Sequence, residues 1–446
     1  MMSHHLPKAI YSYFLSPQPV GTSLSVWYYI KKRKVSTVGV FTEFAANLRE
    51  QNSNVRWFMF CVFINGFIMS SLSVMLGIYY KNIGLTEAAI GGLLSIRTLG
   101  TSIGALLAIL LVQSFGTRKG LTISFIAMVI SGLLFINVRY IPVMQLASLI
   151  FGMSQSVINV VQAPFYKKNS TDDTVVGTFS CSFVLGNCAM FLGSFLFGGL
   201  SDFFALFGGA AFGSQTALNI SIVLLCIVPF ALTRIDFMEE PSQQSGRLKE
   251  LFGFFQGLSL DAWLYLAKVA CIGVGAGLII PFFSVYIKYS LGVTDSVVGS
   301  IMAFAQFGTV LGGLVVPSLS RRIGRVRMVI LCQLLSIPFL FSISFPQGAY
   351  MMALSFFFRN TFMNMANPIL QSLAMDLVEE KNRTVMSSAF SLTDNIFRAV
   401  STQAGGYLMM AVSYNFPYYL TMLFYLISTL IVYFVFGRKE QYRNLR

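Results

Sequence analysis

The chain has 446 residues, of which 55% are hydrophobic and only 11% are charged. A soluble protein of this length cannot bury so much apolar surface, so most of the chain is expected in a membrane. The formal net charge of +14 does not indicate nucleic-acid binding. The basic residues stand in short runs between apolar segments of about twenty residues.

Residues 1–56 are polar and mixed, and they include the basic run from Lys31 to Lys34. Their most apolar stretch, residues 24–30, is too short to span a bilayer. No apolar core followed by a small-residue cleavage site is present, so a signal peptide is not predicted. We expect a cytoplasmic extension that is disordered or lies at the membrane surface. A start codon placed too far upstream is the alternative.

Twelve apolar segments follow, each long enough to span a bilayer as a helix. The first six are expected near residues 57–80, 88–113, 121–137, 143–165, 177–200 and 214–233. The second six are expected near residues 263–287, 296–319, 328–346, 349–374, 385–411 and 415–437. The predicted fold class is an all-α polytopic membrane protein of two six-helix bundles. Its parts are an N-terminal lobe (57–233), a linker (234–262), a C-terminal lobe (263–437) and a tail (438–446).

An internal repeat relates the two halves: residues 84–119 and 292–327 superpose without a gap at an offset of 208 residues. Eight positions agree, namely Gly84/Gly292, Thr86/Thr294, Glu87/Asp295, Gly91/Gly299, Gly100/Gly308, Thr101/Thr309, Gly104/Gly312 and Gly116/Gly324. Internal repeats of this kind are typical of secondary transporters. The recurring glycines predict close contacts between the lobes, in the helix pairs 2/11 and 5/8.

The basic residues are distributed unevenly between alternate loops. If the N-terminus is cytoplasmic, 24 of the 31 Lys and Arg residues lie on that side, and only Lys81, Arg139 and Lys288 lie outside. The positive-inside rule therefore predicts that both termini and the linker are cytoplasmic, in the cell membrane. We expect a monomer in the lipid bilayer, with no nucleic-acid partner.

The loops after the second and eighth helices carry a sequence motif, Gly116-Thr117-Arg118-Lys119 and Arg322-Ile323-Gly324-Arg325. Together with the two six-helix halves, it resembles the major facilitator superfamily over residues 57–437. The resemblance implies a secondary transporter whose gating loops contain Gly116, Arg118, Lys119, Arg322, Gly324 and Arg325. The family's Asp is replaced by Gln113 and Arg321. The end of the fifth helix lacks the Pro of the antiporter motif, which leaves the direction of transport open.

Four charged side chains are predicted deep in the membrane: Arg97, Arg359, Asp394 and Arg398. Lys268 is expected near a helix end, where it can reach the interface. A deep charge costs about 2.5–3.5 kcal/mol, so each should face the protein interior or a water-filled cavity. Asp394 and Arg398 are one helical turn apart. We expect the arginines to bind substrate and, if transport is proton-coupled, Asp394 to carry the proton. A permanent structural Asp394–Arg398 pair is the alternative.

Amide side chains form a stripe on each of two equivalent helices, at spacings i, i+4, i+7. The fourth helix carries Gln155, Asn159 and Gln162, and the tenth carries Asn360, Asn364 and Asn367. Hydrogen-bonded contacts between helices would explain such stripes at about 0.6 kcal/mol per bond. The symmetry between the halves favours the walls of a polar cavity, so Gln155, Asn159, Asn364 and Asn367 are predicted to bind substrate.

These features favour a transporter of a small organic solute that works by alternating access. An enzyme is not predicted, because the apolar segments contain no His and only one deep acid. No GxxxxGK[ST] loop for a nucleotide-driven pump occurs. We expect an anionic or zwitterionic solute, with proton-coupled efflux as one mode and no cofactor or metal. The alternatives are an uptake symporter or uniporter for a sugar-like or amphiphilic solute, and a transporter-like sensor or scaffold without flux.

Overall fold

A computed structural model of the protein describes residues 48–49, 51–171, 174–237, 258–345, 348–379 and 383–437. Most of the predicted extension, linker and tail therefore lies outside the described residues, as does the side chain of Arg321. The chain divides into two compact units, residues 1–50 and 51–446, and all helices named below belong to the second. The regular structure of the described residues is entirely helical.

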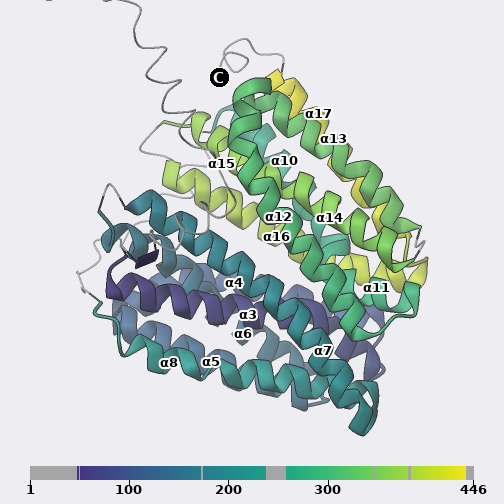
Figure 1. Ribbon diagram of the computed structural model, residues 1–446. Helices are drawn as coiled ribbons and strands as arrows, with labels where there is room; N and C mark the ends of the chain where they lie inside the picture. Colours follow the sequence, from purple (N-terminus) through teal and green to yellow (C-terminus); the bar gives the residue numbers. More distant parts are fainter. Residues whose placement is uncertain are drawn as a thin grey trace, which may run out of the picture. The chain divides into compact units, whose positions relative to one another are not determined.

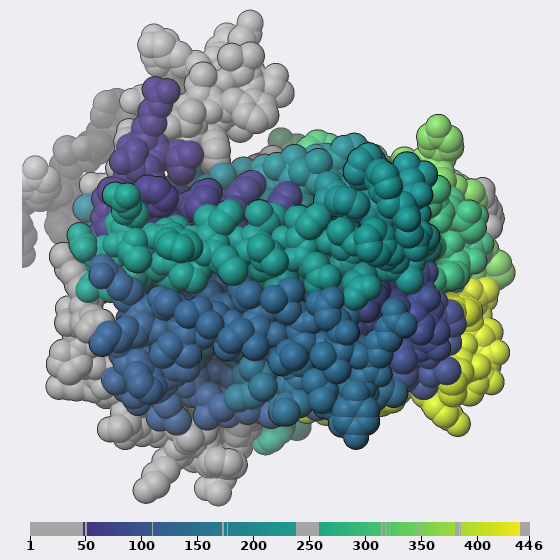
Figure 2. Space-filling model, turned by 90° about the horizontal axis from the view of Figure 1, so that it is seen from below, coloured from purple at the N-terminus to yellow at the C-terminus, as the bar shows by residue number. Residues whose placement is uncertain are grey.

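The N-terminal lobe is drawn from purple to teal in Figure 1. Its helices are α3 (Ser53–Asn82), α4 (Glu87–Phe115), α5 (Thr117–Asn137), α6 (Ile141–Lys168), α7 (Val175–Leu224) and α8 (Ile227–Leu232). The fifth and sixth predicted helices are joined directly within α7, which turns at Gly209 with a φ of 83°. Glycine accepts this backbone conformation without a steric penalty, so no separate loop is needed there. Seen from below, the helices of this lobe cover most of the visible face (Figure 2).

The C-terminal lobe is drawn in green and yellow (Figure 1). Its elements are α10 (Leu260–Ile279), the 3-10 turn η1 (Ile280–Phe282), α11 (Phe283–Leu291), α12 (Asp295–Ile323), α13 (Arg325–Ser344), α14 (Ala349–Met365), α15 (Asn367–Asp376), α16 (Arg383–Ala411), α17 (Phe416–Val432) and the π-helix η3 (Tyr433–Gly437). Pro281 lies in η1, between α10 and α11, and Pro368 opens α15 directly after α14. Proline cannot donate the backbone hydrogen bond of a helix interior, which explains both interruptions.

Nine helices in the described part of the chain are long and apolar enough to cross a membrane. Three features account for the difference from twelve. The fifth and sixth predicted spans are merged into one, and the tenth is divided between α14 and α15. The eleventh, α16, carries Asp394, Arg398 and many other polar residues. Within the described residues, each of the twelve predicted segments lies mostly in helices.

The internal repeat is visible in equivalent contacts. The hydroxyl of Tyr79 on α3 donates to the carbonyl of Ile136, and the hydroxyl of Tyr286 on α11 donates to the carbonyl of Ile343 over 2.9 Å. Both bonds join residues 57 positions apart. Because the same contact recurs in each lobe, the repeat in the sequence reflects two copies of one structural unit.

The lobes meet through α4 with α16 and through α7 with α12. These are the predicted helix pairs 2/11 and 5/8. The assignment of the glycines was only partly right. A Cβ on Gly91 would contact α16 of the other lobe, but one on Gly104 would lie 2.4 Å from the Cα of Met153 on α6. Gly100 likewise faces α6, and Gly308 and Gly312 face α14, so these four glycines allow close packing within a lobe.

Candidate functional site

A cavity between the lobes, here called the N-terminal cavity, has a volume of about 900 Å³. Helices α3, α6 and α7 of the N-terminal lobe form most of its wall, and α12 of the C-terminal lobe contributes Val310 and Gly313. Both lobes therefore line it. A movement of one lobe against the other would change its shape and its access to solvent.

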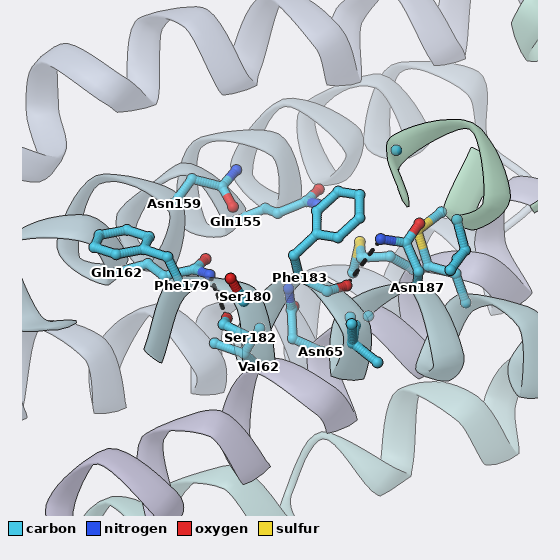
Figure 3. A pocket seen from close by; sticks show the side chains of 17 residues that line it. Val62, Asn65, Gln155, Asn159, Gln162, Phe179, Ser180, Ser182, Phe183 and Asn187 are labelled. Atoms are coloured by element: carbon cyan, nitrogen blue, oxygen red, sulfur yellow. Dashed lines mark hydrogen bonds between the residues drawn. The ribbon is translucent and has the colours of Figure 1, made fainter. Parts of the chain in front are cut away.

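The polar lining of the N-terminal cavity consists of amides and hydroxyls (Figure 3). Gln155 and Asn159 lie on one side of the space, and Asn65 and Ser182 lie across from them. Gln162 donates to the hydroxyl of Ser182 over 3.1 Å. The Oδ1 atom of Asn65 is buried and has no hydrogen-bond partner among the described residues. These groups offer donors and acceptors without any ionised side chain.

A second cavity, here called the C-terminal cavity, lies among α10, α13, α14, α15 and α16 and has a volume of about 160 Å³. Asp394 and Arg398 line it, as do Asn367 and Gln371. Arg398 chelates the carboxylate of Asp394 through three N–O contacts of 2.9–3.2 Å. The structure therefore brings together three residues predicted for the site: Asn367, Asp394 and Arg398.

Lys268 also lines the C-terminal cavity, which the sequence analysis did not predict. Lys268 is only 2% exposed, and its ammonium group lies 5.6 Å from the centroid of the Tyr265 ring. Lys268 stands in the middle of α10 and not at a helix end, because that helix begins earlier and continues through η1 into α11. Lys268 is the ninth of the 32 residues in the span Leu260–Leu291, so its place in the sequence does not by itself show that it lines a cavity.

Three other predicted site residues line neither cavity. Arg359 is 3% exposed, and its guanidinium donates to Asn360 over 2.9 Å and to the Tyr425 hydroxyl over 3.0 Å. Asn364 donates to Thr309 on α12 over 3.2 Å. Arg97 lies on α4, and its Nη1 atom is buried without a hydrogen-bond partner in the described part of the chain. Their predicted role in substrate binding stays a prediction.

The predicted gating loops adopt one geometry in both lobes. Gly116 connects α4 to α5 with a φ of 80°, and Gly324 connects α12 to α13 with a φ of 94°. The basic residues of these loops contact acids of their own lobe: Arg118 lies 3.6 Å from Asp236, and Arg325 lies 3.3 Å from Asp376. Lys119 and Arg322 are exposed.

Hydrogen bonds join the lobes at the opposite end, which carries Lys81 and Lys288. Asp202 on α7 accepts from the backbone amides of Asp295 and Ser296 over 3.0 and 2.7 Å, so it caps α12 from the other lobe. Asp295 in turn pairs with Lys288 over 2.6 Å. We call this end, defined by Lys81 and Lys288, the closed end.

The equivalent contact in the first half involves Lys81, Glu87 and Tyr414. Lys81 pairs with Glu87, the counterpart of Asp295, and the hydroxyl of Tyr414 between α16 and α17 donates to the same carboxylate. Burial and this hydrogen bond raise the pKa of Tyr414 above its usual range, so the phenol stays protonated and donates. Each lobe therefore contributes a side chain that forms hydrogen bonds at the start of a helix in the other lobe: Asp202 at α12 and Tyr414 at α4.

Among the described residues, no group of three His, Cys, Asp or Glu side chains could hold a metal ion. The cysteines that are described are unpaired thiols. The chemistry available in the two cavities is hydrogen bonding by amides and hydroxyls, and ionic contact by Lys268, Asp394 and Arg398.

Comparisons with known proteins agree with this architecture. Residues 265–445 match the family model of the Major Facilitator Superfamily. The nucleoside transporter NupG shares the fold with a TM-score of 0.71 at 14% identity, over 86% of this chain and 99% of that one. A bacterial homologue of the human lysosomal transporter Spinster, inward-facing and occupied, gives 0.69 at 12% identity, over 87% and 97%.

A bacterial metal transporter also shares the fold, with a TM-score of 0.65 at 14% identity, over 87% of this chain and 100% of that one. No curated protein matches the chain in sequence. At these identities the solved structures establish the fold alone, and the sequence match is carried by the C-terminal half. The C-terminal part of the chain, residues 265–445, is thus similar in sequence to the Major Facilitator Superfamily, and the chain shares its fold with the solved transporters named above.

Proposed function

We propose that the protein is a secondary transporter that moves a small organic solute across a membrane by alternating access. The observation that carries this proposal is the N-terminal cavity of about 900 Å³, which is lined by residues of both lobes. A solute held between two lobes can be exposed to either side when the lobes rock about it. Binding pockets for small molecules have volumes of roughly 300–1,000 Å³, so this cavity is large enough.

The lining of the N-terminal cavity favours a polar, uncharged molecular body. Its amides from Gln155, Asn159 and Asn65 can satisfy hydroxyls, carbonyls or ring nitrogens, and Phe179 and Phe183 offer apolar faces. Arg97 and Arg359 line neither cavity. Support for an anionic or zwitterionic solute therefore comes only from Lys268 and Arg398, which line the C-terminal cavity. We therefore infer a polar solute with at most one acidic group.

The contacts at the closed end support rocking of the lobes. The hydrogen bonds that Asp202 and Tyr414 make across the lobes join short polar groups at helix ends, which can separate without unfolding a helix. The lobes are held together there in this structure. With the orientation that the positive-inside rule predicts, the closed end is the outer side.

Coupling to protons would fall to Asp394, the one acid that lines either cavity. Asp394 is paired with Arg398 over 2.9 Å in the conformation seen here. We infer that proton uptake requires the pair to open. Efflux or uptake would then depend on which side of the membrane the pair opens to.

Proteoliposomes loaded with candidate solutes test the proposal. Purified protein should move at least one small polar solute down its gradient, and Gln155→Leu with Asn159→Leu should lower that flux about tenfold or more. Gln215→Leu is the matched control, because Gln215 lies on the same lobe and donates to Asn137, away from the cavity. A protein that binds solutes in this cavity without flux would be a sensor or scaffold, which is the alternative function.

A further inference from the structure

The C-terminal cavity contains two cations and one anion. Lys268 and Arg398 are positively charged, and Asp394 is negatively charged, so the formal charge of the cavity is +1. Both oxygens of Asp394 are already in contact with Arg398, at 2.9–3.2 Å. This bidentate pair neutralises itself. The charge of Lys268 is therefore the one left without a dedicated partner.

In the described part of the chain, the surroundings of Lys268 contain no second negative charge to match it. Its ammonium lies over the Tyr265 ring, 5.6 Å from the ring centroid, and forms no ion pair within the described residues. Only 2% of the residue is exposed, and it borders the C-terminal cavity. A buried charge without a hydrogen-bonded partner costs several kcal/mol. A group that supplies the missing negative charge would remove much of that cost.

The cavity has space and further polar groups for such a ligand. Its volume of about 160 Å³ is several times the roughly 30 Å³ that one water molecule occupies in the liquid. Asn367 and Gln371 line it with amides. Gln333 is fully buried, and while one end of its amide contacts Thr429, the Nε2 end has no partner in the described residues. A carboxylate or a halide ion fits this size and polarity.

The internal repeat shows that the fold does not require these charges. Subtracting the offset of 208 from Asn367, Asp394 and Arg398 gives Asn159, Gly186 and Met190. All three counterparts line the N-terminal cavity. The two cavities are thus equivalent positions in the two lobes, with an amide in both and charges in only one. The same helix packing forms with a glycine and a methionine in place of the ion pair.

We propose that the C-terminal cavity is a binding site for a small monoanion, in which Lys268 provides the attraction and the Asp394–Arg398 pair sets the net charge. The anion is either a carboxylate of the transported solute or a free inorganic ion such as chloride. Only the first of these rests on the proposed transport function. Binding itself is independent of flux and can be measured on the resting protein.

A charge-count series tests the proposal. The wild type has a cavity charge of +1, Lys268→Met has 0, Asp394→Asn has +2, and the double variant returns to +1. Each purified protein, in non-ionic detergent, is titrated with sodium chloride, sodium acetate and sodium benzoate, and the midpoint of thermal unfolding is followed. Lys167→Met is the control, because Lys167 is an exposed lysine of the other lobe.

We expect the anion affinity of Lys268→Met to fall at least about tenfold and that of Asp394→Asn to rise about tenfold, with the double variant near the wild type. Without added anion, Lys268→Met should unfold no earlier than the wild type, because it removes an uncompensated buried charge. A response to carboxylates alone assigns the site to the solute, and a response to chloride alone assigns it to a free ion.

Equal anion-dependent shifts in the wild type, Lys268→Met and Lys167→Met would overturn the site. An early-unfolding Lys268→Met would also contradict it, because Lys268 would then be a stabilising structural partner. Anion binding that follows the charge count in a protein without any solute flux would leave the site intact and remove only the proposed transport function.

Discussion

Gly198 and Gly299 face each other where α7 crosses α12: a Cβ on either one would lie 3.2 Å from the Cα of the other. The pair Gly406 and Gly91 repeats this crossing where α16 meets α4, at 3.1 and 3.2 Å. The second pair follows from the first by adding 208 to Gly198 and subtracting 208 from Gly299. Two glycine crossings related by the repeat therefore join the lobes.

Gly406→Val should separate the lobes at this crossing, because a Cβ there would lie only 2.3 Å from the Glu87 carbonyl. The structure offers a measurement: the Tyr289 hydroxyl donates to Asn82 across the lobes over 2.8 Å. Cysteines at these two positions, with the six native cysteines replaced, should be joined efficiently by a short bifunctional maleimide, and Gly406→Val should reduce the yield severalfold. Gly199→Ala is the control, because its Cβ would meet no atom within 4 Å. Unchanged cross-linking in Gly406→Val would show that the crossing is not needed for closure.

Gly104→Leu and Gly312→Leu should damage folding more than the movement of the lobes. The added side chains would meet Met153 at 2.4 Å and Met365 at 2.6 Å, each within one lobe. Overpacking of this kind costs roughly 1–3 kcal/mol or more. We expect a lower yield of monodisperse protein and a lower unfolding temperature, whereas Gly313→Ala should be neutral because its nearest neighbour is 3.6 Å away. Well-folded variants that only lose transport would restore a role for these glycines between the lobes.

Asp202→Ala should weaken the closed end. It removes the acceptor for the amides of Asp295 and Ser296, and the loss of a helix cap costs about 1 kcal/mol. This corresponds to about a fivefold shift toward lobe separation. Distances between spin labels at the ends of α7 and α12 should broaden toward longer values. Asp202→Asn keeps one acceptor oxygen and should shift the distribution less. Identical distributions in all three proteins would exclude Asp202 as a contact that controls opening.

Arg359→Gln should lower stability and leave solute selectivity unchanged. The guanidinium donates to Asn360 and Tyr425 and lies 5.1 Å from the Phe283 ring, so its removal leaves buried groups unpaired. Such a loss costs about 1–3 kcal/mol. Tyr425→Phe, which removes one of these bonds, should have a smaller effect in thermal unfolding. A variant with wild-type stability and weakened solute affinity would return Arg359 to the binding site.

The predicted orientation is tested at Gln243 in the linker, which lies outside the described residues. A cysteine at this position, in a protein without other reactive cysteines, should react with a membrane-impermeant maleimide only after the cells are opened. The positive-inside rule requires this, because 24 of 31 basic residues share that side. Labelling on intact cells would show that the orientation is the opposite of the predicted one, with the closed end on the cytoplasmic side.

The fold class could be predicted from the sequence alone. Apolar segments of about twenty residues match the thickness of the bilayer as helices, and the internal repeat shows that they form two equivalent sets. Within the described residues, the predicted segments lie mostly in helices, of which nine are long and apolar enough to cross a membrane. The offset of 208 reappears as equivalent contacts, and the helix pairs 2/11 and 5/8 are the pairs through which the lobes meet. The stripe of Gln155 and Asn159 was also visible, since side chains at i and i+4 share one face of a helix.

Tertiary packing decided which side chains share a cavity. The spacing of residues shows which side chains share a helix face, but not which helix that face contacts. Arg359 and Asp394 were therefore both predicted to line the solute-binding site. Arg359 packs against α11 and α17, whereas Asp394 faces α10 across a cavity. Lys268 was expected to reach the interface, but it is buried and lines the C-terminal cavity, because α10 packs against α15 and α16 there. Contacts such as Asp202 with Ser296 join residues 94 positions apart, and only the folded chain brings them together.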